Sequence, residues 1–285
     1  MARYRLHCVG ASGNSFKVAL FLNCAGLDWE PVGLDFAGGE TRTPDWRATT
    51  NVMGEVPVLE VDGRHMSQSG AILLWLAETH GVFRPTPEET FEATRWLLFD
   101  NHKFTANFAQ HRFQRCFMPE PAHPAVLAYL RARTDSAFSI VDRHLSHRSF
   151  MLGDRPTIVD FSMLGYLYYP TEETGFDLAA TFPAIDAWRR RVAELPGWKP
   201  PYDDASRQLT DAPSLRSEQS NRSKKKAARF PKRPFLSYGG CTFHRAISNF
   251  QTGGLSPDRV LVGGRCISGQ SRTVARTERD GLPSP

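Results

Sequence analysis

Two strands, a tight hairpin and a helix follow one another within residues 54–80. Val58-Leu59-Glu60-Val61 is a short apolar run with one polar residue, and it is expected to be a strand. Asp62-Gly63 is a strong signal for a two-residue hairpin turn, so Arg64–Ser67 is expected to return as the next strand. Pro57 is tolerated at the start of the first strand, where no ladder donor is required. This stretch therefore predicts an antiparallel pair of strands.

The helix that follows the hairpin is expected over Gly70–His80. Ser69 is a favourable N-cap and Gly81 a typical stop. First-turn N–H groups and the Ser69 hydroxyl can together hold a carboxylate, helped by the helix dipole. The pair Gln68-Ser69 therefore predicts an anion site at the start of this helix.

The residues before the hairpin complete the pattern of the first domain. Tyr4–Val9 is expected as a strand, Ser15–Ala25 as a helix, Trp29–Leu34 as a second strand and Asp45–Thr49 as one helical turn. A right-handed βαβ unit followed by a hairpin and a helix is the thioredoxin-like layout. We therefore predict a thioredoxin-like α/β domain over residues 1–81.

Long apolar-periodic segments replace the strands after residues 82–87, a Pro-rich break that is expected to be an interdomain linker. Helices are expected at Glu88–Arg115, His123–His147, Phe161–Tyr168 and Pro183–Glu194. Thr157 and Asp160 fit the spacing of a capping box, with Asp in place of the usual Glu or Gln. These segments predict an all-helical domain over residues 88–204.

The charge of the chain divides near Asp204. Residues 1–204 carry 20 Lys and Arg against 25 Asp and Glu, a net of −5, and the remainder carries 15 against 5, a net of +10. No period of 2 or 3.6 persists in residues 205–285, so a disordered basic tail is expected there. The cations of the tail could bind nucleic-acid phosphates non-specifically, but no base-reading motif accompanies them, so a nucleic-acid tether is the less favoured alternative.

Targeting signals are not evident in the sequence. No apolar run approaches the roughly 20 residues of a membrane span, and the start lacks the apolar core of a signal peptide. The five cysteines form no CxxC pair. We therefore expect a reduced, cytoplasmic protein without a membrane partner.

The run GEVPVLEVDG…SQSGAIL resembles the glutathione site of the glutathione S-transferase superfamily. The resemblance extends over about Arg3–Asp204 and includes the capping box of the helical domain. It implies that Pro57 is cis and that the Val56 backbone pairs with the cysteinyl part of glutathione. It also implies that Gln68 and Ser69 hold the γ-glutamyl end, and that the protein is a homodimer.

The loop after the first strand is the candidate for thiol activation. The thiolate of glutathione is the nucleophile, and a hydroxyl or amide that donates a hydrogen bond to the sulfur favours it. By the resemblance, Ser12 matches the activating serine of serine-type members and Asn14 the asparagine of some bacterial members. Ser12, Asn14 and Ser15 stay open as alternatives, with Ser12 preferred. As turn or N-cap residues they would need no function at all.

Position 12 is a serine, which separates this chain from members with a cysteine there that exchange disulfides. Conjugation of glutathione to a small apolar electrophile is therefore the favoured function. Glutathione-dependent reduction of peroxides is the close alternative, and a glutathione S-transferase-like binding module without turnover is the other. Arg42 is the candidate partner of the glycine carboxylate. Glu55 departs from the usual Gln or Lys and would weaken binding of an anionic peptide.

The second substrate is expected against the helical domain. Five residues there are candidates for an apolar cleft between the domains: Phe104, Phe108, His111, Arg112 and Tyr166. For each of them packing in the core is at least as good an interpretation. His102, His111 and His123 have no convincing metal-ligand spacing, so no metal is expected.

Overall fold

The computed structural model describes residues 2–118 and 120–205. The predicted basic tail, residues 205–285, lies outside the described residues apart from Ala205. Of the helices that the structure describes, none combines the length and the apolar character that crossing a bilayer requires.

The first domain contains a four-stranded mixed sheet in the order β2-β1-β3-β4. Its strands are β1 (Tyr4–Cys8), β2 (Trp29–Gly33), β3 (Val58–Val61) and β4 (Arg64–Ser67). β1 and β2 are parallel, joined by helix α1 (Gly13–Cys24), and the other two pairings are antiparallel. Pro31 lies in β2, an edge strand, where one missing donor is tolerated. The thioredoxin-like fold is confirmed.

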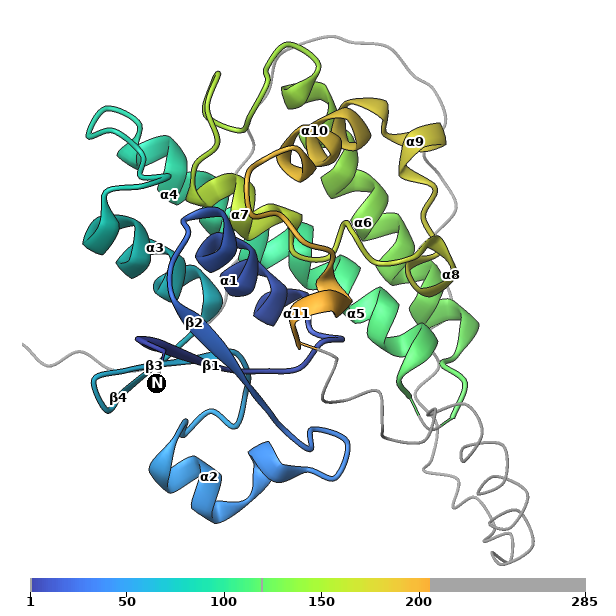
Figure 1. Ribbon diagram of the computed structural model, residues 1–285. Helices are drawn as coiled ribbons and strands as arrows, with labels where there is room; N and C mark the ends of the chain where they lie inside the picture. Colours follow the sequence, from blue (N-terminus) through green and yellow to red (C-terminus); the bar gives the residue numbers. More distant parts are fainter. Residues whose placement is uncertain (1, 119, 206–285) are drawn as a thin grey trace, which may run out of the picture. The chain divides into compact units, whose positions relative to one another are not determined.

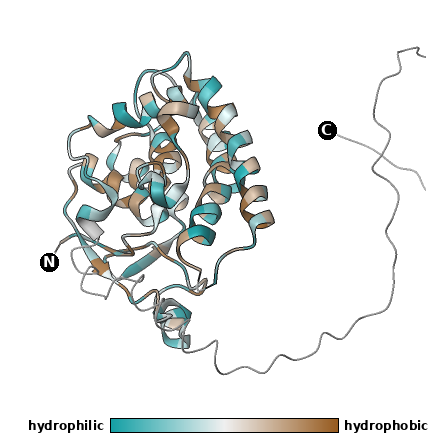
Figure 2. Cartoon of the chain, turned by 90° about the vertical axis from the view of Figure 1, so that its right-hand side faces the viewer, coloured by the Kyte–Doolittle hydropathy of each residue, from teal (hydrophilic) through white to brown (hydrophobic). Residues whose placement is uncertain are grey.

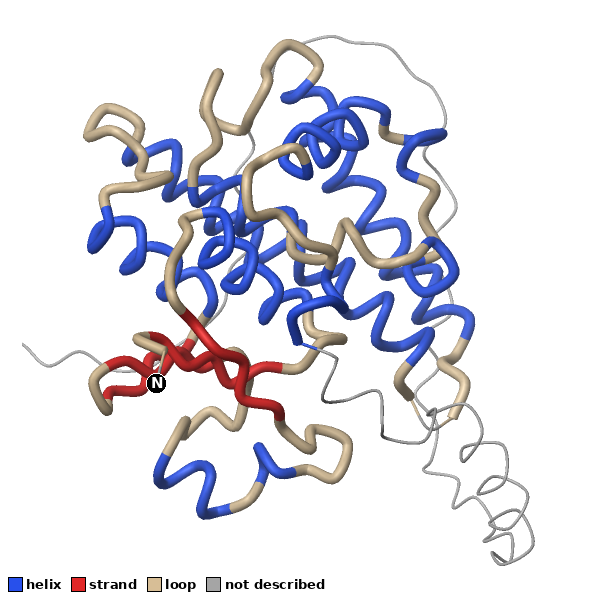
Figure 3. Tube along the Cα trace, viewed as in Figure 1, coloured by secondary structure: helices blue, strands red, loops and turns tan. Residues whose placement is uncertain are grey.

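Helices cover both faces of this sheet (Figures 1 and 3). α1 and α3 (Ser69–His80) lie on one face, and α2 (Pro44–Thr49), preceded by a 3-10 turn at Glu40–Arg42, lies on the other. Because strand side chains alternate, Tyr4 and Leu6 of β1 enter the main core, whereas Arg5 and His7 face α2. The α2 face contains only a small apolar cluster, formed by Leu34, Trp46 and Val58 with Val9 and Val56 packed against it.

The helical domain differs from expectation in its first long segment. The single helix expected over Glu88–Arg115 is instead α4 (Thr90–Phe99), a π-helical turn at Asp100–Phe104, and α5 (Thr105–Cys116). The remaining helices are α6 (Pro124–Leu145), α7 (Ile158–Leu164), α8 (Thr171–Thr174), α9 (Leu178–Thr181), α10 (Pro183–Ala193) and α11 (Pro201–Ala205). Figure 2 shows that the helices carry both hydrophobic and hydrophilic residues, as helices that pack on a core with one face do.

The capping box at the start of α7 is confirmed. The Thr157 N–H donates to Asp160 Oδ2 at 2.8 Å, and Thr157 also accepts from the backbone at the third helical position. Asp160 is fully buried and accepts two further hydrogen bonds, from the Met151 N–H and from Trp188 Nε1. This carboxylate therefore joins α7 to α10 and to the segment before it, in addition to capping the helix.

Candidate functional site

One end of the sheet gathers the three segments that carry the predicted site. β1 ends there at Cys8, β3 begins at Val58, and β4 ends at Ser67, because His7 is paired with Val58 and Val58 with Ser67. The Val56–Pro57 peptide bond is cis, as the resemblance implied. The loop after β1, the segment 56–57 and the pair 68–69 therefore lie at the same end of the sheet.

The start of α3 is an open helix N-terminus. The helix begins at Ser69, one residue earlier than predicted, so Ser69 is not the N-cap. The N-cap is Gln68, which has φ 70° and makes no side-chain capping bond. The first-turn N–H groups are therefore not occupied by a capping side chain, and an anionic ligand can accept their hydrogen bonds. This arrangement is physically suited to a carboxylate.

Glu55 lies at the edge of this anion site. Gln68 Nε2 donates to Glu55 Oε2 at 3.1 Å and also contacts Met53 Sδ at 3.2 Å. Both carboxylate and amide are exposed. A second carboxylate bound at the α3 N-terminus would be repelled by Glu55 and would compete with it for the amide of Gln68.

The loop that precedes α1 and enters its first turn, residues 10–15, is the candidate for thiol activation and is called the reactive loop below. It is organised by Ser12. Helix α1 begins at Gly13, two residues before the predicted start, and Ser12 is its N-cap. Its hydroxyl oxygen accepts from the Ser15 N–H at 3.2 Å. Ser15 is buried, and its own hydroxyl accepts from the Val9 N–H at 3.4 Å. Ser12 and Asn14, both half-buried, are therefore the loop residues that can approach a ligand at the positive end of α1.

Tyr166 closes this helix N-terminus from the side of the helical domain. A Cβ on Gly13 would lie 2.4 Å from Tyr166 Cδ2, so the ring packs directly on the backbone of the loop. Burial raises the pKa of Tyr166, although Arg112 and hydrogen bonds from Ser12 and from the N–H groups of Gly13 and Asn14 act in the opposite direction. The hydroxyl is therefore protonated at neutral pH and lies beside Ser12.

Backbone carbonyls anchor the rest of the loop. Arg112 Nη1 donates to the Ala11 carbonyl at 2.6 Å, and the Tyr169 hydroxyl donates to the Gly10 carbonyl at 2.8 Å. The Arg112 guanidinium stacks on the Tyr169 ring at 3.8 Å and is ion-paired with Glu173. Arg112 was predicted to line a cleft, but its side chain is only 2 % exposed. Its hydrogen bond to the Ala11 carbonyl positions the loop instead.

Three other residues predicted to line a substrate cleft are buried in the helical domain. Phe104 and Phe108 pack on Phe138, with ring centroids 4.8 and 5.0 Å apart, and are 0 % and 1 % exposed. His111 packs edge-on against Phe176 and is 4 % exposed. These positions offer no surface to a second substrate, and their predicted cleft role is corrected for that reason. Of the five, Arg112 and Tyr166 contact the loop, and Tyr166 lies beside Ser12.

Two exposed arginines, Arg42 and Arg47, are candidate partners for a ligand carboxylate. Arg42, the predicted partner of the glycine carboxylate, is the last residue of the 3-10 turn that precedes α2, and its side chain is exposed. Arg47 of α2 was not predicted, yet its guanidinium stands 2.9 Å from where a Cβ on Gly54 would be. Its position follows from the left-handed turn at Gly54 (φ 68°), which no sequence period reveals. Arg47 is therefore a second candidate for a ligand carboxylate.

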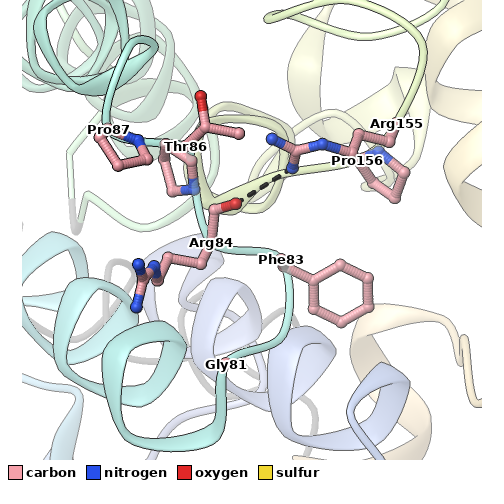
Figure 4. A pocket seen from close by; sticks show the side chains of 8 residues that line it. Gly81, Phe83, Arg84, Thr86, Pro87, Arg155 and Pro156 are labelled. Atoms are coloured by element: carbon pink, nitrogen blue, oxygen red, sulfur yellow. Dashed lines mark hydrogen bonds between the residues drawn. The ribbon is translucent and has the colours of Figure 1, made fainter.

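A pocket of about 530 Å³ lies elsewhere, over the linker between the two domains. Figure 4 shows Arg155 donating to the Arg84 carbonyl across it, at 3.0 Å. Both arginines are also ion-paired, Arg84 with Glu78 and Arg155 with Glu89. None of the predicted glutathione-site residues lines this pocket.

Comparisons with known proteins agree with this geometry. The family models for the N-terminal and C-terminal domains of glutathione S-transferase match residues 5–78 and 105–196. A glutathione S-transferase of Xanthobacter autotrophicus is 33 % identical, with a TM-score of 0.63 over 69 % of this chain and 95 % of that one.

Two further relatives are more distant. Glutathione S-transferase F14 of Arabidopsis thaliana is 25 % identical over 209 residues, which are 69 % of this chain and 82 % of the relative. A glutathione transferase homologue of Lodderomyces elongisporus, solved with two glutathione molecules per subunit, is 24 % identical. The two structures align over 69 % of this chain and 96 % of the homologue with a TM-score of 0.62, which shows that their folds are similar. The chain belongs to the glutathione S-transferase family.

Proposed function

We propose that this protein is a glutathione transferase that conjugates the glutathione thiolate to a small apolar electrophile. The observation that carries the proposal is the arrangement at one end of the sheet. There the Ser12-capped start of α1, the cis Val56–Pro57 segment and the uncapped start of α3 adjoin one another. In this proposal the start of α1 binds the sulfur, the Val56–Pro57 segment binds a peptide backbone, and the start of α3 binds a carboxylate.

The γ-glutamyl end is assigned to the α3 N-terminus. Its carboxylate accepts hydrogen bonds from the first-turn N–H groups and from the Ser69 hydroxyl, and Gln68 contributes its amide. The cysteinyl backbone pairs with the Val56 backbone, which Pro57 turns toward the ligand. The glycine carboxylate is assigned to Arg42 or Arg47, both exposed.

The sulfur is assigned to the start of α1. The Ser12 hydroxyl donates a hydrogen bond to the sulfur, which favours the thiolate over the thiol, and the helix dipole adds to this effect. Tyr166 is a second donor beside Ser12, because its phenol is protonated. Asn14 is the remaining donor of the loop. The thiolate then attacks the electrophile, forming a carbon–sulfur bond as the leaving group or the π-electron pair departs.

Cytoplasmic location and a homodimer belong to the same proposal. Large apolar side chains are exposed on neighbouring helices: Leu74 of α3 is 45 % exposed, and Phe91 and Leu98 of α4 are 76 % and 66 % exposed. Association of two copies through these helices would cover these side chains. Light scattering on the purified chain measures the oligomeric state directly.

Calorimetric titration with glutathione tests the proposal. We expect binding at millimolar concentration or tighter, weakened by Ser69→Ala, with Ser12→Ala mainly raising the pKa of the bound thiol. Ser139→Ala, a change on the exposed face of α6, is the matched control and leaves both quantities unchanged.

An electrophile and peroxide panel then separates the alternatives. Turnover of electrophiles supports conjugation, whereas turnover confined to organic peroxides would replace conjugation with peroxide reduction by the same thiolate. Binding without turnover on either class would make the protein a glutathione-binding module. Absence of binding at physiological glutathione levels would contradict the proposal.

A further inference from the structure

Four polar side chains occupy the α2 face of the sheet beside its small apolar cluster. Glu60 of β3 is paired directly with Arg5 of β1 on one side and with His65 of β4 on the other. His7 lies two residues along β1 from Arg5, and so on the same face. Three strands therefore bring two imidazoles and one carboxylate together.

The ligand atoms of these residues are close to the spacing that zinc requires. His7 Nε2 lies 3.0 Å from Glu60 Oε2, and His65 Nε2 lies 3.8 Å from the same oxygen. The three potential ligand atoms all lie within 4.8 Å of one another. Ligands about 2.0–2.1 Å from a tetrahedral zinc ion stand about 3.3 Å apart, so only small side-chain adjustments separate the cluster from a ligand set.

We propose that His7, Glu60 and His65 form a binding site for a divalent transition metal of the zinc type, with water in the fourth position. Imidazole nitrogen and carboxylate oxygen are ligands that zinc accepts, and one carboxylate partly neutralises the charge of the ion. The site would tie β1, β3 and β4 together on the face opposite α1 and α3. It does not depend on the proposed glutathione chemistry.

The ring nitrogens of His7 are placed differently. Nε2 faces Glu60 Oε2 at 3.0 Å, whereas Nδ1 is buried and has no hydrogen-bond partner in the described residues. In the tautomer that carries its proton on Nδ1, Nε2 has a lone pair directed toward Glu60 and can coordinate a cation placed between the two groups.

Arg5 is the competitor for the same carboxylate. Its Nη1 lies 2.8 Å from Glu60 Oε2, while its Nε lies 3.1 Å from Glu30 Oε1. The side chain is 40 % exposed, so it can leave Glu60 and keep Glu30 when a cation binds. Removing the charge of Arg5 therefore strengthens metal binding, which distinguishes a metal site from a merely structural network.

Zinc chloride titration of the full chain by calorimetry tests the site. We expect binding at micromolar zinc, weakened at least tenfold in His65→Ala and in Glu60→Gln and tightened in Arg5→Gln. His147→Ala removes an exposed imidazole far from the sheet in sequence, and serves as the matched control with unchanged binding. A hundredfold excess of zinc over Kd is expected to raise the Tm by about 5–10 °C, and this rise disappears in His65→Ala.

Cobalt substitution identifies the ligands independently of affinity. The proposed site predicts visible absorption bands of four-coordinate Co²⁺ without thiolate charge-transfer bands, and their loss in His65→Ala. Unchanged zinc affinity in both His65→Ala and Glu60→Gln would overturn the proposal. Cobalt spectra dominated by thiolate bands would overturn it as well, because they would place the metal on cysteines.

Discussion

Lys17 Nζ lies 3.0 Å from Asp100 Oδ2, and both side chains are fully buried. The pair joins α1, whose first turn carries the reactive loop, to the π-helical turn that interrupts α4 and α5. Asp100 also accepts from the Ser162 hydroxyl at 2.7 Å and from Thr105. Of these three donors to the Asp100 carboxylate, Lys17 is the charged one. Removing Lys17 is therefore costly, because the buried carboxylate would lose its counter-charge.

We expect Lys17→Met to lower the free energy of unfolding by about 3–5 kcal/mol, because it leaves a buried carboxylate without its counter-charge. Combining it with Asp100→Asn removes the stranded charge and restores most of that loss. Urea denaturation measures both. Glu92→Gln, which breaks an exposed pair with Arg95, serves as the control and costs less than about 1 kcal/mol. A loss no larger in Lys17→Met than in this control would contradict the expectation.

Gly13→Ala is expected to destabilise the protein, although Ala is ordinarily about 1 kcal/mol better than Gly in a helix. The new Cβ would lie 2.4 Å from the Tyr166 ring and would overpack the loop, at a cost of about 1–3 kcal/mol. Gly70→Ala is the matched control, because its Cβ meets only Asn101 at an ordinary 3.6 Å. Thermal unfolding compares the two, and a stabilised Gly13→Ala would refute the close packing of Tyr166.

Glu55→Gln is expected to tighten glutathione binding about two- to fivefold, because it removes a like charge beside the anion site. The gain shrinks as salt is added, since the group is exposed. Calorimetry at two ionic strengths measures it. Glu78→Gln, an exposed carboxylate paired with Arg84, is the control and leaves affinity unchanged. Equal effects of the two substitutions would separate Glu55 from the site.

Tyr166→Phe is expected to raise the pKa of bound glutathione thiol by about one unit, because it deletes a donor but keeps the ring packed on Gly13. Ultraviolet titration of the thiolate in the complex measures this pKa. Glutathione affinity at low pH, where the bound group is the thiol, is expected to stay within twofold. A thiol pKa equal to that of the wild type would exclude Tyr166 from contact with the sulfur.

Acidification is expected to destabilise the fold through its buried histidines. Burial lowers the pKa of His111 and of His144, the latter beside Trp96 with Nε2 2.8 Å from the Met151 carbonyl. Below about pH 6.5 the unfolded chain therefore binds protons that the folded chain does not. The contribution of these two histidines to the free energy of unfolding is fully present above that pH and is lost progressively as the pH decreases toward 5. Urea midpoints across this range measure the slope, and His144→Gln should flatten it.

The sequence predicted most of the first domain because its signals are local. The Asp62-Gly63 turn lies directly between β3 and β4 and pairs Val61 with Arg64, so a local signal determines the hairpin register. The predicted first residue of α1 was wrong because Ser12 and Ser15 are both acceptable N-caps. In the structure the Ser15 N–H donates to the Ser12 hydroxyl and Tyr166 packs on Gly13, so Ser12 is the N-cap. The π-helical turn was missed because its apolar residues keep a helical spacing through Phe104.

Long-range placement could not be predicted in the same way. Spacing identifies Phe104 and Phe108 as one apolar stripe, but it does not say whether that stripe faces a core or a cleft. The approach of His7 to Glu60 depends on the pairing of β1 with β3 across some fifty residues of chain. Arg47 reaches Gly54 only through a left-handed turn, which depends on the fold around it.

The helical domain holds the reactive loop by its main chain, through the Gly10 and Ala11 carbonyls. The Ser12 side chain also hydrogen-bonds Tyr166, but the two carbonyl contacts use only main-chain atoms of the loop, so they do not depend on which residues occupy positions 12 and 14. A serine, a cysteine or an asparagine at position 12 would meet the same helix end. Substitutions at position 12 can therefore be compared with one another while the two anchored peptide groups stay in place.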